Sequence, residues 1–141
     1  STQLYPCLWV DGKAKELALF YCSIFPNSKI ISENPIVVIF ELNGSKYMTL
    51  NGGPEHKINS AISFVIPCET QDEIDHYWHK LGENGTEGKC GWITDQYGVS
   101  WQVVPNILGK LMNNPETAPK AMFAFMQMKK FDIAALIESS K

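Results

Sequence analysis

Residues 91–105, GWITDQYGVSWQVVP, hold the pattern that decides the fold. A short apolar run, a turn and a longer apolar run follow one another, which predicts a hairpin that feeds a strand. Within that strand Gln102 is a single polar residue between apolar neighbours. Residues 5–21, YPCLWVDGKAKELALFY, predict a strand, a glycine turn and an amphipathic helix. Together the two stretches indicate a small α+β fold that binds a small molecule.

The first half of the chain predicts one β-α-β-β-β module. After the helix, residues 29–32 predict a short strand, and residues 36–42 form a β-branched run. That run ends at Asn43-Gly44, a strong signal for a hairpin, and residues 47–51 predict the returning strand.

A second module follows in the same order. Residues 61–66 predict a strand, and Thr70 with Glu73 predicts a capping box at the start of a helix. An offset of 57 residues relates the two apolar helix stripes, Leu17, Phe20 and Tyr21 in the first and Ile74, Tyr77 and Trp78 in the second. We therefore predict one domain, 1–141, with module one at about 1–55, module two at about 60–105 and a helical tail at about 106–141.

The tail is predicted to contain short helices at 108–112 and 120–128 and a last helix capped by Asp132. Four of the five methionines of the chain lie here, Met112, Met122, Met126 and Met128. Methionine-rich helices either form adaptable binding surfaces or pack in a core or a dimer interface. We predict packing.

The bulk composition is that of a soluble globular protein and excludes two classes of partner. The chain has 141 residues, 45% of them hydrophobic and 19% charged, with a net charge of −3. All twelve basic residues are lysines, so bidentate arginine recognition of phosphates and guanines is absent and we expect no nucleic acid partner. The longest apolar run, 36–40, is far shorter than the roughly 20 residues that span a membrane, so we expect no membrane partner.

The four cysteines indicate a reducing compartment. They form no C-x-x-C pair, and the first residues show no signal-peptide pattern. We therefore expect a cytoplasmic protein whose cysteines, Cys7, Cys22, Cys68 and Cys90, are reduced.

The alternation of side chains along strands predicts which residues face a helix in the first module. If Leu8 and Val10 face the helix, then Tyr5, Cys7 and Trp9 share the opposite face. If the apolar pair Met48 and Leu50 faces the helix in the returning strand, the residues left for the opposite face are Tyr47, Thr49 and Asn51.

The same reasoning applies to the second module. There Ile62, Phe64 and Ile66, and likewise Val99, Trp101 and Val103, are predicted to face the helix. The opposite faces combine aromatic rings with short polar groups, as small-molecule pockets do. We predict ligand-binding residues on these faces and assign no catalytic residue and no metal ligand; the ligand-binding set is Tyr5, Cys7, Trp9, Tyr47, Thr49, Asn51, Ser63, Trp92, Ser100 and Gln102.

Several segments resemble the vicinal oxygen chelate superfamily, which includes glyoxalase I, extradiol dioxygenases and the bleomycin- and fosfomycin-resistance proteins. The early D-G-x7-F-Y pattern and the late D-x-x-G-x4-V pattern carry this likeness. Within the superfamily, the PhnB-like branch, also called the 3-demethylubiquinone-9 3-methyltransferase domain family, is similar in four segments: PCLWVDGKAKELALFY, LNGGPEHKINSAISF, KCGWITDQYGVSWQVVP and MKKFDIAAL. The resemblance implies paired modules that curl into a cup-shaped mixed sheet, with helices outside, in a homodimer.

The resemblance also implies where a metal would be held. One ligand comes from each of four strands, at positions near Tyr5, near Asn51, Thr49 or Tyr47, near Ala61, and at Gln102. Divalent metals prefer imidazole nitrogen or carboxylate oxygen, and none of these residues supplies either. We therefore expect no resident cofactor, with a divalent metal as the alternative that the resemblance leaves open.

Four functions remain open, the last being a purely structural dimer whose sheet face is covered by the methionine-rich tail. The leading prediction is a protein that binds a small organic molecule without a complete metal site. The second is a metal-dependent lyase, isomerase or dioxygenase of the glyoxalase type that uses Gln102 and Asn51, with help from His56 in the loop after the first module as a general base. The third is the methyltransferase that the family label names, although no glycine-rich dinucleotide loop precedes a helix. His76 and His79, three residues apart, are expected to be solvated or packed rather than metal-bound.

Overall fold

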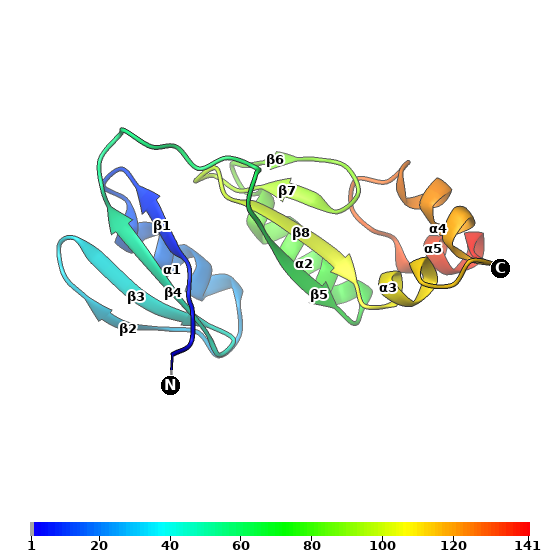
Figure 1. Ribbon diagram of the computed structural model, residues 1–141, viewed down its shortest axis with the longest axis horizontal. Helices are drawn as coiled ribbons and strands as arrows, with labels where there is room; N and C mark the ends of the chain where they lie inside the picture. The colour runs from blue at the N-terminus through cyan, green and yellow to red at the C-terminus, as the bar shows by residue number, and fades with distance from the viewer. Residues whose placement is uncertain (1) are drawn as a thin grey trace. The chain divides into compact units, whose positions relative to one another are not determined.

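A computed structural model describes residues 2–141, which form two compact units divided between Ile58 and Asn59 (Figure 1). Each unit contains one strand, one helix and three further strands in that order. The predicted α+β fold with two β-α-β-β-β modules and C-terminal helices is therefore confirmed.

The first unit contains one four-stranded mixed sheet. Its elements are β1 (Cys7–Val10), α1 (Ala14–Ile24), β2 (Lys29–Glu33), β3 (Val37–Leu42) and β4 (Ser45–Asn51). The strand order is β1-β4-β3-β2, with β1 parallel to β4 and the other pairs antiparallel. Asn43 and Gly44 have φ values of 50° and 89°, as the predicted two-residue hairpin requires.

Helix α1 covers one face of this sheet. Leu17 and Tyr21 on the helix and Val38 and Phe40 on β3 are buried, and the rings of Tyr21 and Phe40 lie 6.5 Å apart. Burial of this apolar surface holds the helix on the sheet. The other side of the sheet, which faces away from α1, is called open face 1.

The second unit repeats the arrangement. Its elements are β5 (Ser63–Cys68), α2 (Gln71–Gly82), β6 (Thr86–Glu87), β7 (Trp92–Thr94) and β8 (Ser100–Pro105). The strand order is β5-β8-β7-β6, again with one parallel pair, β5 and β8. The side of this sheet that faces away from α2 is called open face 2.

Helix α2 starts and packs as its sequence predicts. Thr70 and Glu73 form the capping box, and Ile74 and Leu81 are fully buried. One residue of this unit was assigned wrongly: Ile62 is 73% exposed, because β5 begins only at Ser63 and Ile62 precedes the paired part of the strand.

The tail contains α3 (Ile107–Met112), α4 (Ala118–Phe125) and α5 (Ile133–Ser139), and is held against α2. The Gln71 amide donates to the carbonyl of Phe131 (2.9 Å) and accepts from the backbone N–H of Ile133 (2.8 Å). Phe131 is buried against Gly91, where a β-carbon would lie 2.6 Å from its ring. No helix within residues 2–141 is long and apolar enough to cross a membrane.

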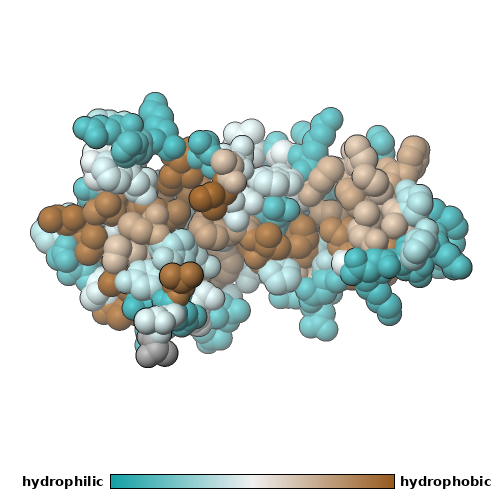
Figure 2. All heavy atoms as spheres, in the orientation of Figure 1, coloured by the Kyte–Doolittle hydropathy of each residue, from teal (hydrophilic) through white to brown (hydrophobic). Residues whose placement is uncertain are grey.

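Two of the tail methionines do not pack within the chain, so a dimer interface is the form of the predicted packing left for them. Met122 and Met126 are 46% and 54% exposed, and Phe123 between them is 75% exposed. The small residue Ala121 occupies the buried side of α4 instead. Figure 2 shows apolar side chains gathered over this helix. Phe125, at the end of α4, packs on the buried ring of Phe131, with ring centres 5.9 Å apart.

A buried carboxylate, Asp95, fixes the turn between β7 and β8. Its Oδ1 accepts from the backbone N–H groups of Tyr97 (2.8 Å) and Val99 (3.1 Å), and its Oδ2 accepts from the indole of Trp101 (2.9 Å). Asp95 is 3% exposed. Asp95, the first residue of the D-x-x-G pattern, therefore organises the hairpin that positions β8.

Replacing Asp95 with alanine should lower the free energy of unfolding by about 3 kcal/mol or more, because three donors lose their acceptor in a buried place. Urea unfolding followed by circular dichroism measures this change. The variant Glu55→Ala, which removes an exposed carboxylate, is the control and should change stability little. Equal stability of the two variants would contradict the structural role of Asp95.

Candidate functional site

Strand register places two of the predicted ligand-binding residues on open face 1. In the β1–β4 pairing, Leu8 lies opposite Thr49, and Thr49 points to α1. Because side chains alternate along a strand, Cys7 and Trp9 point the other way. The predicted placement of Cys7 and Trp9 on the face away from the helix is therefore confirmed.

The predicted placement of Tyr47, Thr49 and Asn51 on that face is wrong. The Thr49 hydroxyl donates to the carbonyl of Ala14 (3.0 Å), and the Asn51 carbonyl oxygen accepts from the N–H of Ala14 (2.8 Å). Tyr47 stacks on Phe40 with ring centres 5.6 Å apart, on the α1 side. The physical reason is that α1 has no side-chain cap of its own, so the polar residues of β4 supply its hydrogen bonds.

Open face 1 is consequently more apolar than the sequence predicts. Met48 and Leu50 alternate with the residues that face α1, so they lie on the open side with Ile39, the cross-strand neighbour of Met48. All three are half-buried. The strands of open face 1 carry three charged groups, Lys29, Glu41 and Lys46, which lie side by side in register at one end of the sheet.

Trp9 is held rigidly at the other end of open face 1. Its indole N–H donates to the carbonyl of Gly53 (2.8 Å), and its ring lies directly on Gly52, where a β-carbon would be 2.3 Å from the ring. The ring of His56 meets it edge to face at 4.8 Å. His56, which the sequence suggested as a general base, thus lies beside a fixed aromatic surface.

The two other sequence-predicted residues near β1 have limited chemistry. The Tyr5 ring lies 4.6 Å from the ammonium of Lys46, a cation–π contact. Partial burial raises the pKa of the Cys7 thiol. Since the thiolate is the nucleophile, Cys7 is less reactive than an ordinary cysteine at neutral pH.

On open face 2, Gln102 and Ser63 form a polar pair. The Gln102 amide donates to the hydroxyl of Ser63 (3.0 Å) across the parallel β5 and β8 strands. Trp92 lies opposite Gln102 in the register of β7 and β8, and therefore on the same face. The predicted placement of Ser63, Trp92 and Gln102 on one face is confirmed.

The rest of open face 2 is uncharged. Val65 is 55% exposed and Val104 is half-buried, while Ser100 is on this face by register but is itself buried. Thr94, the cross-strand neighbour of Ser100, also lies here and was not predicted. The strand residues of this face carry no charged group, and they are Ser63, Val65, Pro67, Thr86, Trp92, Thr94, Ser100, Gln102 and Val104.

The donor chemistry does not fit a divalent metal. With the register corrected, the open-face residues of β4 at the implied position are Met48 and Leu50 rather than Asn51. The remaining positions hold Tyr5, Ala61 and Gln102, so the set contains no imidazole and no carboxylate. Within residues 2–141, no group of three or more His, Cys, Asp or Glu side chains is arranged to hold a metal ion.

A family model and a solved structure that are similar to this chain carry the same family description. The sequence model of the family described as 3-demethylubiquinone-9 3-methyltransferase matches residues 2–104. The PhnB protein of Bacillus cereus is 30% identical, with a TM-score of 0.68, and the alignment covers 74% of this chain and 99% of that one. A search of curated proteins finds no match.

Two more distant structures share the fold. Protein PA1353 of Pseudomonas aeruginosa is 18% identical, with a TM-score of 0.62, and covers 74% of this chain and 98% of its own. The fosfomycin resistance protein FosX of Listeria monocytogenes, solved with Mn(II) and sulfate, is 14% identical, with a TM-score of 0.59, over 80% and 96% of the two chains. At this identity the likeness concerns the fold alone.

Replacing Asn51 with alanine should lower the free energy of unfolding by about 1–2 kcal/mol, because α1 loses the acceptor for its first N–H. The variant Asn51→Asp keeps an oxygen at that place, where a helix N-terminus favours negative charge, and should lose less. Thermal unfolding of both variants tests this. If Asn51→Ala unfolds at the wild-type temperature, the side chain faces away from α1 and the corrected register is wrong.

Proposed function

Because the chain belongs to the PhnB-like 3-demethylubiquinone-9 3-methyltransferase family of the vicinal oxygen chelate superfamily, we propose that it binds a small, uncharged organic molecule. The observation that carries this proposal is the composition of open face 2. Its strand residues combine an indole, apolar side chains and one amide–hydroxyl pair, without a single charge. Pockets for small organic ligands have this balance of apolar walls and few polar groups.

The Gln102–Ser63 pair defines the chemistry of the ligand. One of the two amide N–H groups of Gln102 is used by Ser63, which leaves the other N–H and the Ser63 hydroxyl as donors and the Gln102 carbonyl as an acceptor. A carboxamide or an alcohol offers the matching donor and acceptor. An ionised group would lose its hydration without gaining a counter-charge, which is costly.

Two other functions are weaker. A metal-dependent glyoxalase, isomerase or dioxygenase needs ligands that the implied positions do not supply, since they hold Tyr5, Met48 or Leu50, Ala61 and Gln102. The methyltransferase that the family description names would need a site for a methyl donor. We propose neither a resident metal nor a methyl donor for this protein.

Benzamide and benzyl alcohol should bind more tightly than benzoate and benzylammonium, which are matched in size but charged. The Gln102→Leu variant should lose about tenfold in affinity for benzamide, because one buried hydrogen bond is worth about 1 kcal/mol or more. Titrations followed by the indole signals in ¹H–¹⁵N spectra measure both effects. The variant Gln127→Leu, in the tail, is the control.

Elemental analysis of protein purified without chelator separates this proposal from the metal enzyme. Near one equivalent of a divalent metal per chain, retained on dialysis, would favour the enzyme. Tighter binding of benzoate than of benzamide would also contradict the proposal.

We further propose a cytoplasmic homodimer that uses the exposed face of α4. Met122, Phe123 and Met126 form a continuous apolar stripe on that face, and charged residues are absent from it. The Lys120 ammonium, at the border of the stripe, is engaged by the carbonyl of Lys141 (2.9 Å). Two such stripes, one from each copy of the chain, would therefore meet without burying any charged group. Methionine sulfur also packs well on aromatic rings.

The variant Phe123→Glu should be monomeric where the wild-type chain is dimeric, because a carboxylate would be buried at the centre of the contact. Light scattering coupled to size-exclusion chromatography measures the mass at several concentrations. Leu19→Glu is the control, since Leu19 on α1 is also exposed (51%) but lies outside the stripe. A dimeric Phe123→Glu variant, or a monomeric wild-type chain, would contradict the proposal.

A further inference from the structure

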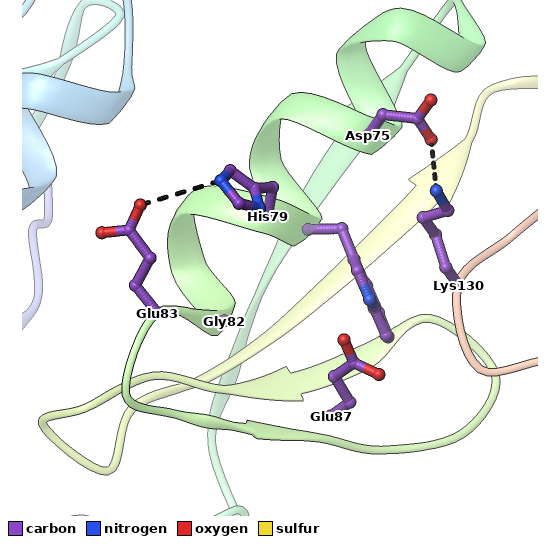
Figure 3. Close-up of a pocket in the computed structure, with 7 residues that line it drawn as sticks. Asp75, His79, Gly82, Glu83, Glu87 and Lys130 are labelled. Carbon is purple, nitrogen blue, oxygen red and sulfur yellow. Dashed lines mark ion pairs between the residues drawn. The ribbon is translucent and has the colours of Figure 1, made fainter.

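The second unit has a groove on the α2 side of its sheet, away from open face 2. Its volume is about 330 Å³, which is the size of a small-ligand site. Figure 3 shows how the labelled side chains surround it. The side chains that line it include Asp75, Trp78, His79, Glu83, Glu87 and Lys130.

Three elements bring these residues together. Asp75, His79 and Glu83 follow one another at intervals of four residues, so they lie along one side of α2 and its C-terminal end. Glu87 comes from β6, where its register partner Ile93 is buried on the α2 side of the sheet. Lys130 comes from the tail, which is held against α2 (Figure 3).

The carboxylates of the groove are compensated unequally. Asp75 is paired with Lys130 at 2.8 Å, and the hydrogen bonds from Lys130 and Gln71 hold the pKa of Asp75 below its usual value. Glu83 lies 4.0 Å from His79 and 3.8 Å from Lys80. Glu87 has no ion pair with any residue in the described part of the chain.

The charge balance favours a cation. Three carboxylates and one lysine line the groove, Lys80 reaches Glu83 from outside that lining, and the C-terminal end of α2 adds a partial negative charge, so Glu87 is the carboxylate left without a counter-charge. An anion would meet Glu83 and Glu87 at close range. A positively charged group near Glu87 would supply the counter-charge that the protein does not.

Trp78 adds an unused hydrogen-bond donor to the groove. It is 93% buried, being 7% exposed, and within residues 2–141 its indole N–H donates to no other group. No buried side-chain nitrogen or oxygen in this part of the chain lacks a partner, so the indole nitrogen must reach an accessible surface, and the surface that Trp78 lines is the groove. An indole N–H that reaches an accessible surface can donate to an oxygen of a ligand there.

We infer that this groove binds a small organic cation that carries a neutral oxygen, of the amino alcohol class. The ammonium lies between Glu87 and Glu83, and the hydroxyl oxygen accepts from the indole N–H of Trp78. The hydroxyl proton remains available for a carboxylate of the groove. No covalent step is involved, and the site is separate from the Gln102–Ser63 pair on the opposite face of the sheet.

Ethanolamine hydrochloride is the probe, and the indole N–H signals of the four tryptophans are the readout. Disappearance of one signal in Trp78→Phe identifies the Trp78 signal. Ethanolamine should shift that signal saturably with a dissociation constant of about 1–10 mM, as expected for partly exposed charge pairs. Ethanol, which lacks the charge, and glycolate, which reverses it, should not shift it at the same concentration and ionic strength.

The variant Glu87→Gln should weaken ethanolamine binding about fivefold, and the control Glu116→Gln, which makes the same change of net charge in the tail, should not. Both replace exposed carboxylates, so both are expected to fold. Three results would overturn the inference: no saturable shift of the Trp78 signal, equal shifts with glycolate, or unchanged affinity in Glu87→Gln. None of these depends on whether benzamide binds open face 2.

Discussion

Two hydrogen bonds between β4 and the first turn of α1 determine what the first unit can present to a ligand. The carbonyl and N–H of Ala14 are taken by the Thr49 hydroxyl and the Asn51 amide. Because side chains alternate along a strand, these bonds also turn Met48 and Leu50 to open face 1. The apolar character of that face is therefore a consequence of how α1 is capped.

The second unit satisfies the first N–H groups of its helix in a different way, and this explains why its open face is more polar than open face 1. Helix α2 satisfies its first N–H groups with its own capping box, Thr70 and Glu73. The strand β8 then has no helix terminus to serve, and Gln102 is free to face away from α2 and to bond Ser63. Two modules with the same order of elements thus differ in their faces because one helix caps itself and the other does not.

This difference also sets the limit of what the sequence predicts. The two modules, the Asn43-Gly44 hairpin and the capping box follow from local signals and are confirmed, as are the faces of the paired residues of β5 and β8, Ile62 before β5 excepted. Local signals do not predict which face of β4 points to the helix. The rule that apolar residues point to the helix fails there, because Asn51 caps a helix that lies 37 residues away in sequence. Likewise, the exposure of Phe123 depends on how closely α4 packs on the rest of the tail. The buried position on α4 is taken by the small residue Ala121. The periodicity of apolar residues in the sequence does not predict long-range hydrogen bonds or close packing.

The shortest strand shows how one sheet can carry two opposite chemistries. In β6, Thr86 lies opposite Thr94 and Glu87 opposite Ile93, so alternation alone sends the hydroxyl to open face 2 and the carboxylate to the α2 side. A one-residue shift of β6 would exchange them, placing a charge on the uncharged face and removing it from the groove. The turn at Gly85 resists such a shift. A shift by one residue would bring Asn84 or Thr86 to the place of Gly85, and a β-carbon at that place would lie 2.3 Å from the carbonyl of Thr94. The separation of a neutral face from an acidic groove therefore depends on the register of two residues.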